Sequence, residues 1–476
     1  MKLTAGDIAR SIHGKLVSGS AASVDSVISA VSIDTRTIER GDLFVAIRGP
    51  HRDGHDYVAR AIESGAAGIV VSQSIEIAGS AFQVQVNDTT RALQDLAQIV
   101  RERAGIRVVA ITGSMGKTTT KEAAAAAMGK GRRVLKTKGN LNNLYGLPLT
   151  LLELGEAGEV DVAVVEMGMS EPGEIARLTE IAKPDVGVLT NVAEVHLEFF
   201  DSLSQIADAK GELLLGLAGD AVAVVNADDP LVLAQARKFA GRHIRFGLSP
   251  STDLRARQIR STAAGLRFRA EEGEHSVEVT SSLHGRHNVY NLLAGLAAAR
   301  ALDVPLEDAA SGLASLSPPP HRGERIALPG SILLIDETYN SNPRALICAL
   351  DTLVEEDEGR RVAVVGDMLE LGPHASELHR EVGRHAATLE LGLFVGVGPL
   401  GREIVAGARE AGMAEARLAI CDDAAAAGRL LEHNLVEGDV VLVKGSRGVG
   451  LDETIEWTKR ALSEGREGRE GREGKT

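Results

Sequence analysis

The sequence lacks long hydrophobic runs and has almost no cysteine. No run of about 18 apolar side chains occurs in its 476 residues, and the opening MKLTAGDIAR carries charges throughout, unlike a signal peptide. We therefore expect no membrane insertion and a cytoplasmic location. The two cysteines, Cys348 and Cys421, have no C-x-x-C spacing, so neither a zinc site nor a disulfide framework is indicated.

Positive charge is also in short supply. Lysine and arginine number 52 against 66 aspartate and glutamate residues, which gives a formal net charge of −14. This balance argues against nucleic-acid binding over a broad surface, although local basic pockets for an anionic small substrate remain compatible with it. The other proportions, 44% hydrophobic and 25% charged residues, are typical of a globular protein. A chain of this length predicts two to four domains.

Apolar, strand-like runs alternate with longer helical stretches in two separate parts of the chain. VVAITG, DVAVVEMG, VGVLTNV and AVAVVNADDP lie in the middle, and SILLID, RVAVVGDM, LGLFVGVG and DVVLVKG lie near the end. This alternation predicts two separate parallel α/β sheets. Between them, DLRARQIR, GLRFRAEEG and HSVEVTSSL predict a small antiparallel insert, and the proline-dense LSPPPHRGER predicts a linker.

We therefore predict three α/β domains. A small N-terminal domain covers residues 1–86, a central domain with a mostly parallel sheet and the antiparallel insert covers 87–317, and a C-terminal Rossmann-like domain covers 318–463. The remaining residues, 464–476, repeat Gly-Arg-Glu and have no apolar side chain to bury, so we expect a disordered tail.

ITGSMGKTTTKE, from Ile111 to Glu122, lies between a strand-like run and a helix-like one and predicts a phosphate-binding loop. Gly113 and Gly116 permit the tight backbone path that points N–H groups inward, Lys117 supplies a positive charge, and Thr118 can bind magnesium. The strict P-loop pattern has glycine where Ile111 stands, so this loop is a variant. The alternative is a glycine-rich turn with a chance lysine.

Three side chains downstream of this loop are candidates for metal binding. Glu166 ends the DVAVVEMG strand, at the edge where α/β sheets place ligand-contacting residues, and His196 follows the next strand. Each alone has an alternative as an ordinary loop residue. Lys210, in DAKGELL, has the alternative of a solvated surface charge; carbamylation by CO₂ would convert it into a carboxylate able to hold a metal.

Taken together, these residues resemble the Mur ligase family, ATP-dependent amide-bond formers that extend the nucleotide precursor of bacterial peptidoglycan. The resemblance covers essentially all of the chain except the tail and includes DTRTIERGDLFVAIRGPHRDGHDY, VVEMGMSEPGEI, TNVAEVHLEFF, HGRHNVYNLLAGLA and VLVKGSRG. GNLNNLYGLPLTLL, YNSNP and GDMLELG are most similar to the member that adds D-alanyl-D-alanine to UDP-N-acetylmuramoyl-tripeptide. The resemblance implies a monomeric enzyme with ATP, two Mg²⁺ ions and a carbamylated Lys210 in its site.

The resemblance also implies roles for individual residues. Catalysis would involve Lys117, Glu166, His196 and Lys210, and the metal ions would be held by Thr118, Glu166, His196 and Lys210. ATP would contact Gly113, Ser114, Met115, Gly116, Lys117, Thr118, Thr119, Asn140, His287, Asn288, Asn291, Arg322 and Asp336. The UDP-peptide and the incoming dipeptide would contact Asp34, Thr35, Arg36, Phe44, Arg48, Gly49, Asp53, His55, Asn340, Asn342 and Lys444.

The reaction implied is transfer of the γ-phosphate to a carboxylate of the tripeptide, followed by attack of the dipeptide amine on the acyl phosphate. Three domains that carry separate substrates predict an open-to-closed motion, and in an open form Arg322 and Asp336 would lie far from the loop. Two alternatives remain. One is a neighbouring Mur-type ligase that adds a single amino acid, because the segment NPR also resembles the motif by which that ligase recognises its amino acid. The other is a nucleotide-binding regulatory protein without ligase activity.

Overall fold

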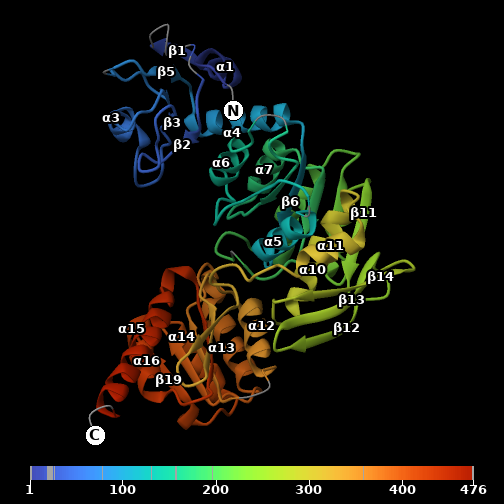
Figure 1. The fold of residues 1–476 in the computed structure, drawn as a ribbon, viewed down its shortest axis with the longest axis vertical. Helices are drawn as coiled ribbons and strands as arrows, with labels where there is room; N and C mark the ends of the chain where they lie inside the picture. The colour runs from blue at the N-terminus through green and yellow to red at the C-terminus, as the bar shows by residue number, and fades with distance from the viewer. Residues whose placement is uncertain are drawn as a thin grey trace.

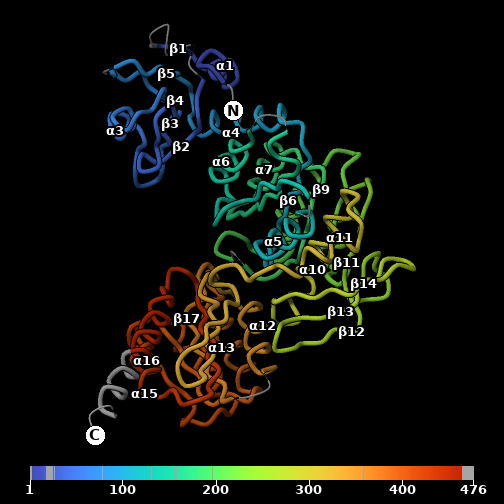
Figure 2. Tube along the Cα trace, in the orientation of Figure 1, coloured from blue at the N-terminus to red at the C-terminus, as the bar shows by residue number. Residues whose placement is uncertain are grey.

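The computed structural model describes residues 3–18, 25, 27–77, 79–129, 131–155, 158–195, 197–356 and 359–473, with side chains described as far as residue 463. Three bodies follow one another along the chain, each built around its own sheet (Figure 1). The trace passes through them in order, and the central body lies between the other two (Figure 2). The predicted class of three α/β domains is confirmed.

The N-terminal domain contains a five-stranded sheet with the order β1-β5-β4-β3-β2, parallel except for β1. Its elements are α1 (Ala5–Ser11), β1 (Lys15–Ser18), β2 (Val31–Ser32), β3 (Leu43–Val45), the 3₁₀ helix η1 (Gly54–Tyr57), α3 (Val58–Glu63), β4 (Gly68–Val71) and β5 (Phe82–Gln85). Thr4 begins α1 with a capping box, because its hydroxyl accepts the N–H of Asp7 while the Asp7 carboxylate accepts the N–H of Thr4.

The central domain contains a nine-stranded sheet with the order β14-β13-β12-β11-β10-β9-β6-β8-β7. Its strands are β6 (Arg107–Thr112), β7 (Val134–Lys136), β8 (Val162–Glu166), β9 (Val186–Leu189), β10 (Val222–Asn226), β11 (Arg242–Gly247), β12 (Leu254–Thr262), β13 (Gly265–Glu272) and β14 (His275–Ser281). Strands β6 to β12 pair in parallel, whereas β12, β13 and β14 form an antiparallel extension of the same sheet. The predicted antiparallel insert is therefore continuous with the parallel sheet.

The helices of the central domain cover both faces of this sheet. They are α4 (Thr89–Ala104), α5 (Lys117–Met128), α6 (Gly146–Leu152), α7 (Glu174–Ala182), α8 (Leu203–Leu215), α9 (Pro230–Ala236), α10 (His287–Ala301) and α11 (Leu306–Leu313). Alternate strand residues enter separate cores: Val108 and Ala110 pack on the face of α4, α6 and α7, whereas Val109 and Ile111 pack on the face of α5 and α10. Burial on both faces explains why the parallel strands are nearly continuous hydrophobic runs.

The C-terminal domain contains a six-stranded sheet with the order β15-β16-β20-β17-β18-β19, parallel except for β15. Its elements are β15 (Glu324–Leu328), β16 (Ile332–Glu337), α12 (Pro343–Val354), β17 (Arg361–Gly366), η2 (Gly372–His374), α13 (Ala375–Ala386), β18 (Leu393–Val397), α14 (Gly401–Glu410), η3 (Glu415–Arg417), β19 (Leu418–Cys421), α15 (Ala424–Asn434), β20 (Val440–Lys444), η4 (Arg447–Val449) and α16 (Asp452–Glu473). Helices α12, α13 and α14 cover one face, and α15 and α16 cover the other.

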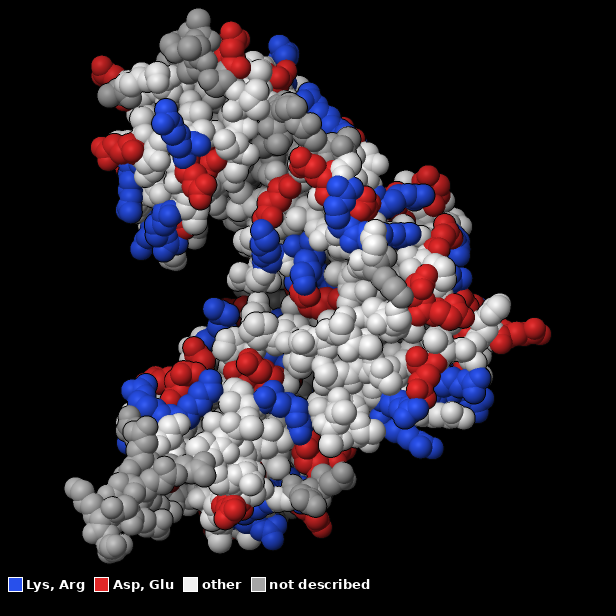
Figure 3. Space-filling model, in the orientation of Figure 1, with Lys and Arg blue, Asp and Glu red and all other residues white. Residues whose placement is uncertain are grey.

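On the face shown in Figure 3, a hollow separates the N-terminal domain from the C-terminal domain, and the central domain forms its floor. The helix α16 extends into the stretch for which the sequence predicts disorder. The side chains of 464–476 lie outside the described part of the chain, so that prediction stays a prediction. In the described part of the chain, no helix combines the length and the apolar character that a bilayer span requires.

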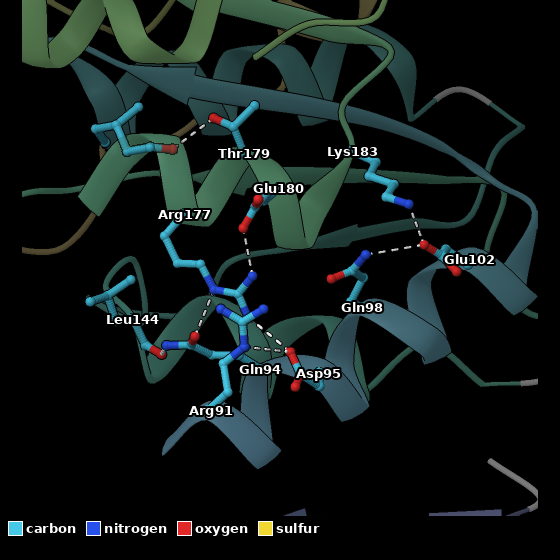
Figure 4. Close-up of polar contacts among 11 residues, drawn as sticks. Arg91, Gln94, Asp95, Gln98, Glu102, Leu144, Arg177, Thr179, Glu180 and Lys183 are labelled. Atoms are coloured by element: carbon cyan, nitrogen blue, oxygen red, sulfur yellow. Dashed lines mark hydrogen bonds and ion pairs between the residues drawn. The ribbon is translucent and has the colours of Figure 1, made fainter. Parts of the chain in front are cut away.

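Helix α4 connects the N-terminal domain to the phosphate-loop strand, and polar contacts bind it to the central domain (Figure 4). Arg177 of α7 donates to Gln94 at 2.8 Å and to Asp95 at 3.0 Å, and Gln94 donates to the carbonyl of Leu144 at 3.2 Å. These contacts accompany a buried apolar stripe on α4. Helix α4 also lies in the core cluster that contains Leu43 and Val84 of the N-terminal domain, so one apolar core joins the N-terminal domain to the central domain.

Candidate active site

The predicted phosphate loop connects the end of β6 to the start of α5. Gly113 and Gly116 have φ values of +149° and +78°, and a Cβ would lie 1.9 Å from Thr190 Oγ1 at the first and 2.1 Å from Asn291 Oδ1 at the second. Only glycine fits at these two positions, so the backbone can approach a ligand closely. The Nζ of Lys117 donates to the Gly113 carbonyl at 2.8 Å, which holds the ammonium over the loop.

The segment that follows β9 holds this loop in place. Asn191 Oδ1 accepts the N–H of Met115 at 2.9 Å, and the Thr190 hydroxyl donates to the Met115 carbonyl at 2.7 Å. The Ser114 hydroxyl donates to the carbonyl of Ala193 at 3.1 Å. Thr190 and Asn191 were not predicted from the sequence, although polar residues directly after a buried parallel strand are the same signal that indicated Glu166.

Glu166, the last residue of β8, is 2% exposed and accepts two hydrogen bonds. Thr118 Oγ1 donates to its Oε2 at 2.8 Å, and Asn142 Nδ2 donates to its Oε1 at 2.7 Å. Thr118 and Glu166 are thus in contact, and their hydroxyl and carboxylate oxygens are hard ligands of the kind that Mg²⁺ prefers. Their predicted role in holding one magnesium ion stays a prediction. Asn142 was not predicted; Asn140, which was, is exposed, and Thr119 is buried within α5.

Lys210 lies on α8 and is 1% exposed, so the alternative of a solvated surface lysine is wrong. Burial lowers the pKa of Lys210 well below its ordinary value, and the positive charge of Lys117 lowers it further. Burial also lowers the pKa of Lys117, with Arg322 adding to the effect and Glu166 opposing it. The two lysines therefore share one electrostatic environment. His196 lies outside the described residues, and its role stays a prediction.

The start of α10 reaches the phosphate loop through its asparagines. Asn291 accepts a hydrogen bond from the Thr120 hydroxyl at 3.3 Å and donates to Asn288 Oδ1 at 2.8 Å. Burial lowers the pKa of His287, Lys444 lowers it further, and Glu337 opposes the change. Since Glu337 and Lys444 belong to the C-terminal domain, His287 lies at the contact between the two domains.

A cavity of about 30 Å³ marks this contact, and it is lined by His287 and Asn288 from α10 and by Arg322 and Glu337 from the other side. The Arg322 guanidinium stacks on Tyr339, with its Cζ 3.8 Å from the ring centre. Its positive charge adds to the effect by which burial lowers the pKa of Lys117. The C-terminal domain is therefore close to the phosphate loop in this structure, whereas the open form was expected to keep Arg322 distant.

Asp336, near the end of β16, is 3% exposed, and both of its carboxylate oxygens accept hydrogen bonds. It accepts hydrogen bonds from His321 Nδ1 at 2.7 Å and from the Thr338 hydroxyl at 2.7 Å. Lys444, at the end of β20, donates to Glu337 at 3.1 Å and to the carbonyl of Asn340 at 2.9 Å. These charged residues converge because β16 and β20 are parallel neighbours that end together.

Two of the predicted dipeptide-binding residues have different surroundings. Asn340 is exposed, and its Oδ1 accepts the N–H of Ser341. Its side chain can therefore still contact a ligand. Asn342 begins α12 as its N-cap, and its Oδ1 accepts the N–H of Ala345 at 2.9 Å. Pro343 at the first helical position completes this start signal. The side chain of Asn342 therefore has a structural task that was not predicted from the sequence.

Most of the predicted residues of the N-terminal domain lie at its surface. Asp34 accepts the N–H of Arg36 at 2.9 Å and pairs with its guanidinium, and the half-buried Thr35 lies between them. Arg48 donates to Asp53 at 2.9 Å across the turn that contains the half-buried Gly49.

Phe44 and His55 differ from these residues because their side chains are buried, and their predicted contact with the UDP-peptide stays a prediction. Phe44, in β3, is 1% exposed and packs in a core cluster with Val58 and Ile69. His55 is 7% exposed; its Nε2 accepts the N–H of Ser72 at 2.9 Å, and its Nδ1 lies 2.5 Å from Asp53. Nε2 therefore carries the lone pair and Nδ1 donates its proton. Hydrogen bonds from the His55 backbone and ring lower the pKa of Asp53 to about 2.

Comparison with protein families divides the chain into three consecutive matches. Residues 27–110 match the Mur ligase family, catalytic domain; residues 111–299 match the Mur ligase middle domain; and residues 321–447 match the Mur ligase, glutamate ligase domain.

Curated relatives are similar over almost their whole length. UDP-N-acetylmuramoyl-tripeptide--D-alanyl-D-alanine ligase of Escherichia coli is 36% identical over 94% of this chain and 97% of its own, and the enzyme of the same name from Bacillus subtilis is 34% identical over 96% and 98%. The crystal structure of MurF from Acinetobacter baumannii has a TM-score of 0.87 at 30% identity, covering 97% of this chain and 99% of its own. MurF ligase from Thermotoga maritima in complex with ADP has a TM-score of 0.81 at 30% identity, covering 91% and 98%. The chain is a member of the Mur ligase family.

Proposed function

We propose that this chain joins D-alanyl-D-alanine to UDP-N-acetylmuramoyl-tripeptide and converts ATP to ADP and phosphate. The observation that carries the proposal is identity of 36% to an enzyme of that name over 94% of the chain. The convergence of Lys117, Glu166, Lys210 and Arg322 around one glycine loop supports it. A regulatory nucleotide-binding protein would have no shared task for these four residues.

The phosphate loop supports transfer of the γ-phosphate to a substrate carboxylate. The N–H groups of the loop and of the α5 N-terminus, with Lys117, would stabilise the negative charge of the transferring phosphoryl group. Arg322 adds a cation from the C-terminal domain. The acyl phosphate formed in this way has phosphate as a good leaving group, so the neutral amine of the dipeptide can displace it and form the amide bond.

Thr118 and Glu166 fit one magnesium ion, because a buried hydroxyl and a buried carboxylate meet at 2.8 Å beside the loop. When bound, the ion would supply positive charge to the phosphate oxygens. Lys210 fits carbamylation: its lowered pKa favours the neutral amine, which adds to CO₂ with release of one proton. The carbamate, together with His196, would hold a second ion.

The remaining substrates are assigned to the outer domains. We assign the UDP-peptide to the surface of the N-terminal domain that carries Asp34, Arg36 and Arg48, where two arginines can pair with its phosphates. The dipeptide would approach from the C-terminal side, near Asn340 and Lys444. His55 would support the N-terminal surface from within the domain through its hydrogen bonds to Asp53.

The decisive experiment measures phosphate release from ATP and magnesium with UDP-N-acetylmuramoyl-tripeptide, and follows the product mass in parallel. We expect release and a mass gain with D-alanyl-D-alanine, and neither of these with free amino acids or in the absence of an amine. Release with a single amino acid on a shorter UDP-peptide would assign the chain to a neighbouring ligase. Hydrolysis independent of any amine would contradict the ligase activity.

A further inference from the structure

Backbone contacts hold Glu166 in position independently of the contacts of its side chain. Glu166 pairs with Ile111 in the parallel sheet, and its N–H donates to the Thr137 hydroxyl at 2.9 Å. The carbonyl of Thr137 in turn accepts a hydrogen bond from the buried Lys121 ammonium at 2.6 Å. Only the side-chain torsions of Glu166 therefore remain to be set, and they decide where its two carboxylate oxygens lie.

Two side chains set these torsions, one on each oxygen. Among the described residues, the hydrogen bonds to the carboxylate come from Thr118 on Oε2 and from Asn142 on Oε1. An ionised carboxylate only accepts, so the Asn142 amide must present its Nδ2. Thr118 gives its single hydroxyl proton to Oε2 and keeps its lone pairs for another partner.

Gly168 provides the space that the Asn142 amide occupies. A Cβ at Gly168 would lie 3.0 Å from Asn142 Oδ1, 3.1 Å from Cγ and 3.2 Å from Nδ2, which is tighter than ordinary van der Waals contact. The N–H of Gly168 also donates to the Asn142 carbonyl at 2.8 Å. The loop is therefore held to the end of β8 by its backbone, and the amide of Asn142 is not needed for that attachment.

We propose that Asn142 is a positioning residue, which orients the Glu166 carboxylate for divalent-cation binding through its amide, in the space that Gly168 leaves. The inference rests on the proposed function, because it takes Glu166 as a metal ligand. A residue that orients a metal ligand typically changes metal affinity by roughly 10-fold to 100-fold when it is removed. A residue that merely held the loop would change nucleotide and metal binding together.

The test measures binding of Mn²⁺ in the presence of ADP by electron paramagnetic resonance of the free ion, and binding of ADP alone in EDTA. We expect Asn142→Ala to weaken Mn²⁺ binding about 10-fold or more, and to leave ADP binding in EDTA unchanged within about twofold. Asn143→Ala is the matched control, since Asn143 Oδ1 accepts the N–H groups of Tyr145 and Gly146 at the start of α6 and does not contact Glu166. It should lower thermal stability and leave Mn²⁺ affinity unchanged.

Gly168→Ala tests the same contact from the other side. We expect it to weaken Mn²⁺ binding as Asn142→Ala does, because its methyl group displaces the amide. The double variant should be no worse than either single variant, since removal of the Asn142 amide leaves room for the new methyl group. Unchanged Mn²⁺ affinity in Asn142→Ala, an equal loss of ADP affinity in EDTA, or additive losses in the double variant would each overturn the inference. Absence of dipeptide-dependent phosphate release by the unmodified protein would instead overturn the proposed function and leave these binding results in place.

Discussion

At the scale of single residues, Lys210 shows how strongly the site departs from ordinary solvent conditions. An exposed lysine stays protonated to about pH 10. Lys210 is 1% exposed and lies near a second cation, so its pKa is well below that value in the folded protein. This environment favours the neutral amine. It also lowers the free energy of unfolding, because Lys210 is protonated in the unfolded chain and must lose that proton when the protein folds.

The first prediction follows from the sign of this effect. Between the lowered pKa and about pH 10, the unfolded chain binds more protons than the folded one, so the Lys210 contribution makes the protein more stable as pH rises and less stable as pH falls. In CO₂-free, metal-free protein, Lys210→Met should raise the free energy of unfolding of the central domain at pH 7 by about 1–3 kcal/mol, and by less at pH 9. Denaturant unfolding at both pH values measures this. Lys238→Met, at an exposed position, is the control. A variant less stable than the parent at pH 7 would contradict the account.

The second prediction concerns the stack of Arg322 on Tyr339. Removing the ring in Tyr339→Leu should cost about 0.5–2 kcal/mol of cation–π attraction and let the guanidinium move away from the phosphate loop. We expect KM for ATP to rise about threefold to tenfold, while Tyr339→Phe, which keeps the ring, stays close to the parent. Steady-state kinetics with varied ATP measure both. Equal effects of the two substitutions would show that the hydroxyl, and not the ring, matters.

At the scale of elements, helix starts and strand ends carry the functional residues. Glu166 ends β8 and Lys444 ends β20, while Lys117 begins α5 and His287 begins α10. This placement follows from the parallel sheets, whose carboxyl edges gather the loops at one side. An apolar run followed by a polar residue indicated Glu166, and the spacing of glycine, lysine and threonine indicated Lys117, whereas His287 and Lys444 were predicted from the family resemblance. The sequence did not reveal Asn142, whose contact with Glu166 depends on how an irregular loop folds back.

The third prediction separates a helix cap from a substrate contact at Asn342. Asn342→Ala should lower the free energy of unfolding by about 1 kcal/mol, because the N–H of Ala345 loses its acceptor, and Asn342→Asp should retain most of the stability. If the side chain serves only as a cap, KM for D-alanyl-D-alanine stays unchanged in Asn342→Asp. Thermal unfolding and dipeptide titration measure the two effects. A dipeptide KM that rises in Asn342→Asp without loss of stability would restore the predicted substrate contact.

At the scale of the whole molecule, the two outer domains stand in different relations to the central one. The C-terminal domain touches it directly: the N–H of Glu198 donates to the Glu370 carbonyl at 3.2 Å, and a Cβ at Gly285 would lie 2.5 Å from Thr352 Oγ1. The N-terminal domain packs on the central domain through one apolar core that includes Val84 of β5, Leu93 of α4 and Leu151 of α6, and it lies across the hollow from the C-terminal domain (Figure 3). The hollow is therefore bounded by both outer domains and by the central domain.

The fourth prediction is that substrate binding narrows this hollow. Small-angle scattering of the protein with UDP-N-acetylmuramoyl-tripeptide and a non-hydrolysable ATP analogue should show a smaller radius of gyration than scattering of the free protein, because the two outer domains move toward each other around the bound ligands. ATP analogue alone should have a smaller effect, since Arg322 already lies near the phosphate loop. An unchanged radius with both ligands would show that this arrangement is already the closed one.

The sequence by itself determined the class of fold and the phosphate loop. These features depend on local patterns, namely strand hydrophobicity and the spacing of glycine, lysine and threonine along one loop, which are read without knowing what packs on what. Only the tertiary structure decided that Phe44 and His55 face inward, that Asn342 caps a helix and that Asn142 contacts Glu166. Each of these depends on which groups from distant parts of the chain surround a side chain, and hydrogen bonding and burial are properties of that surrounding and not of the residue type.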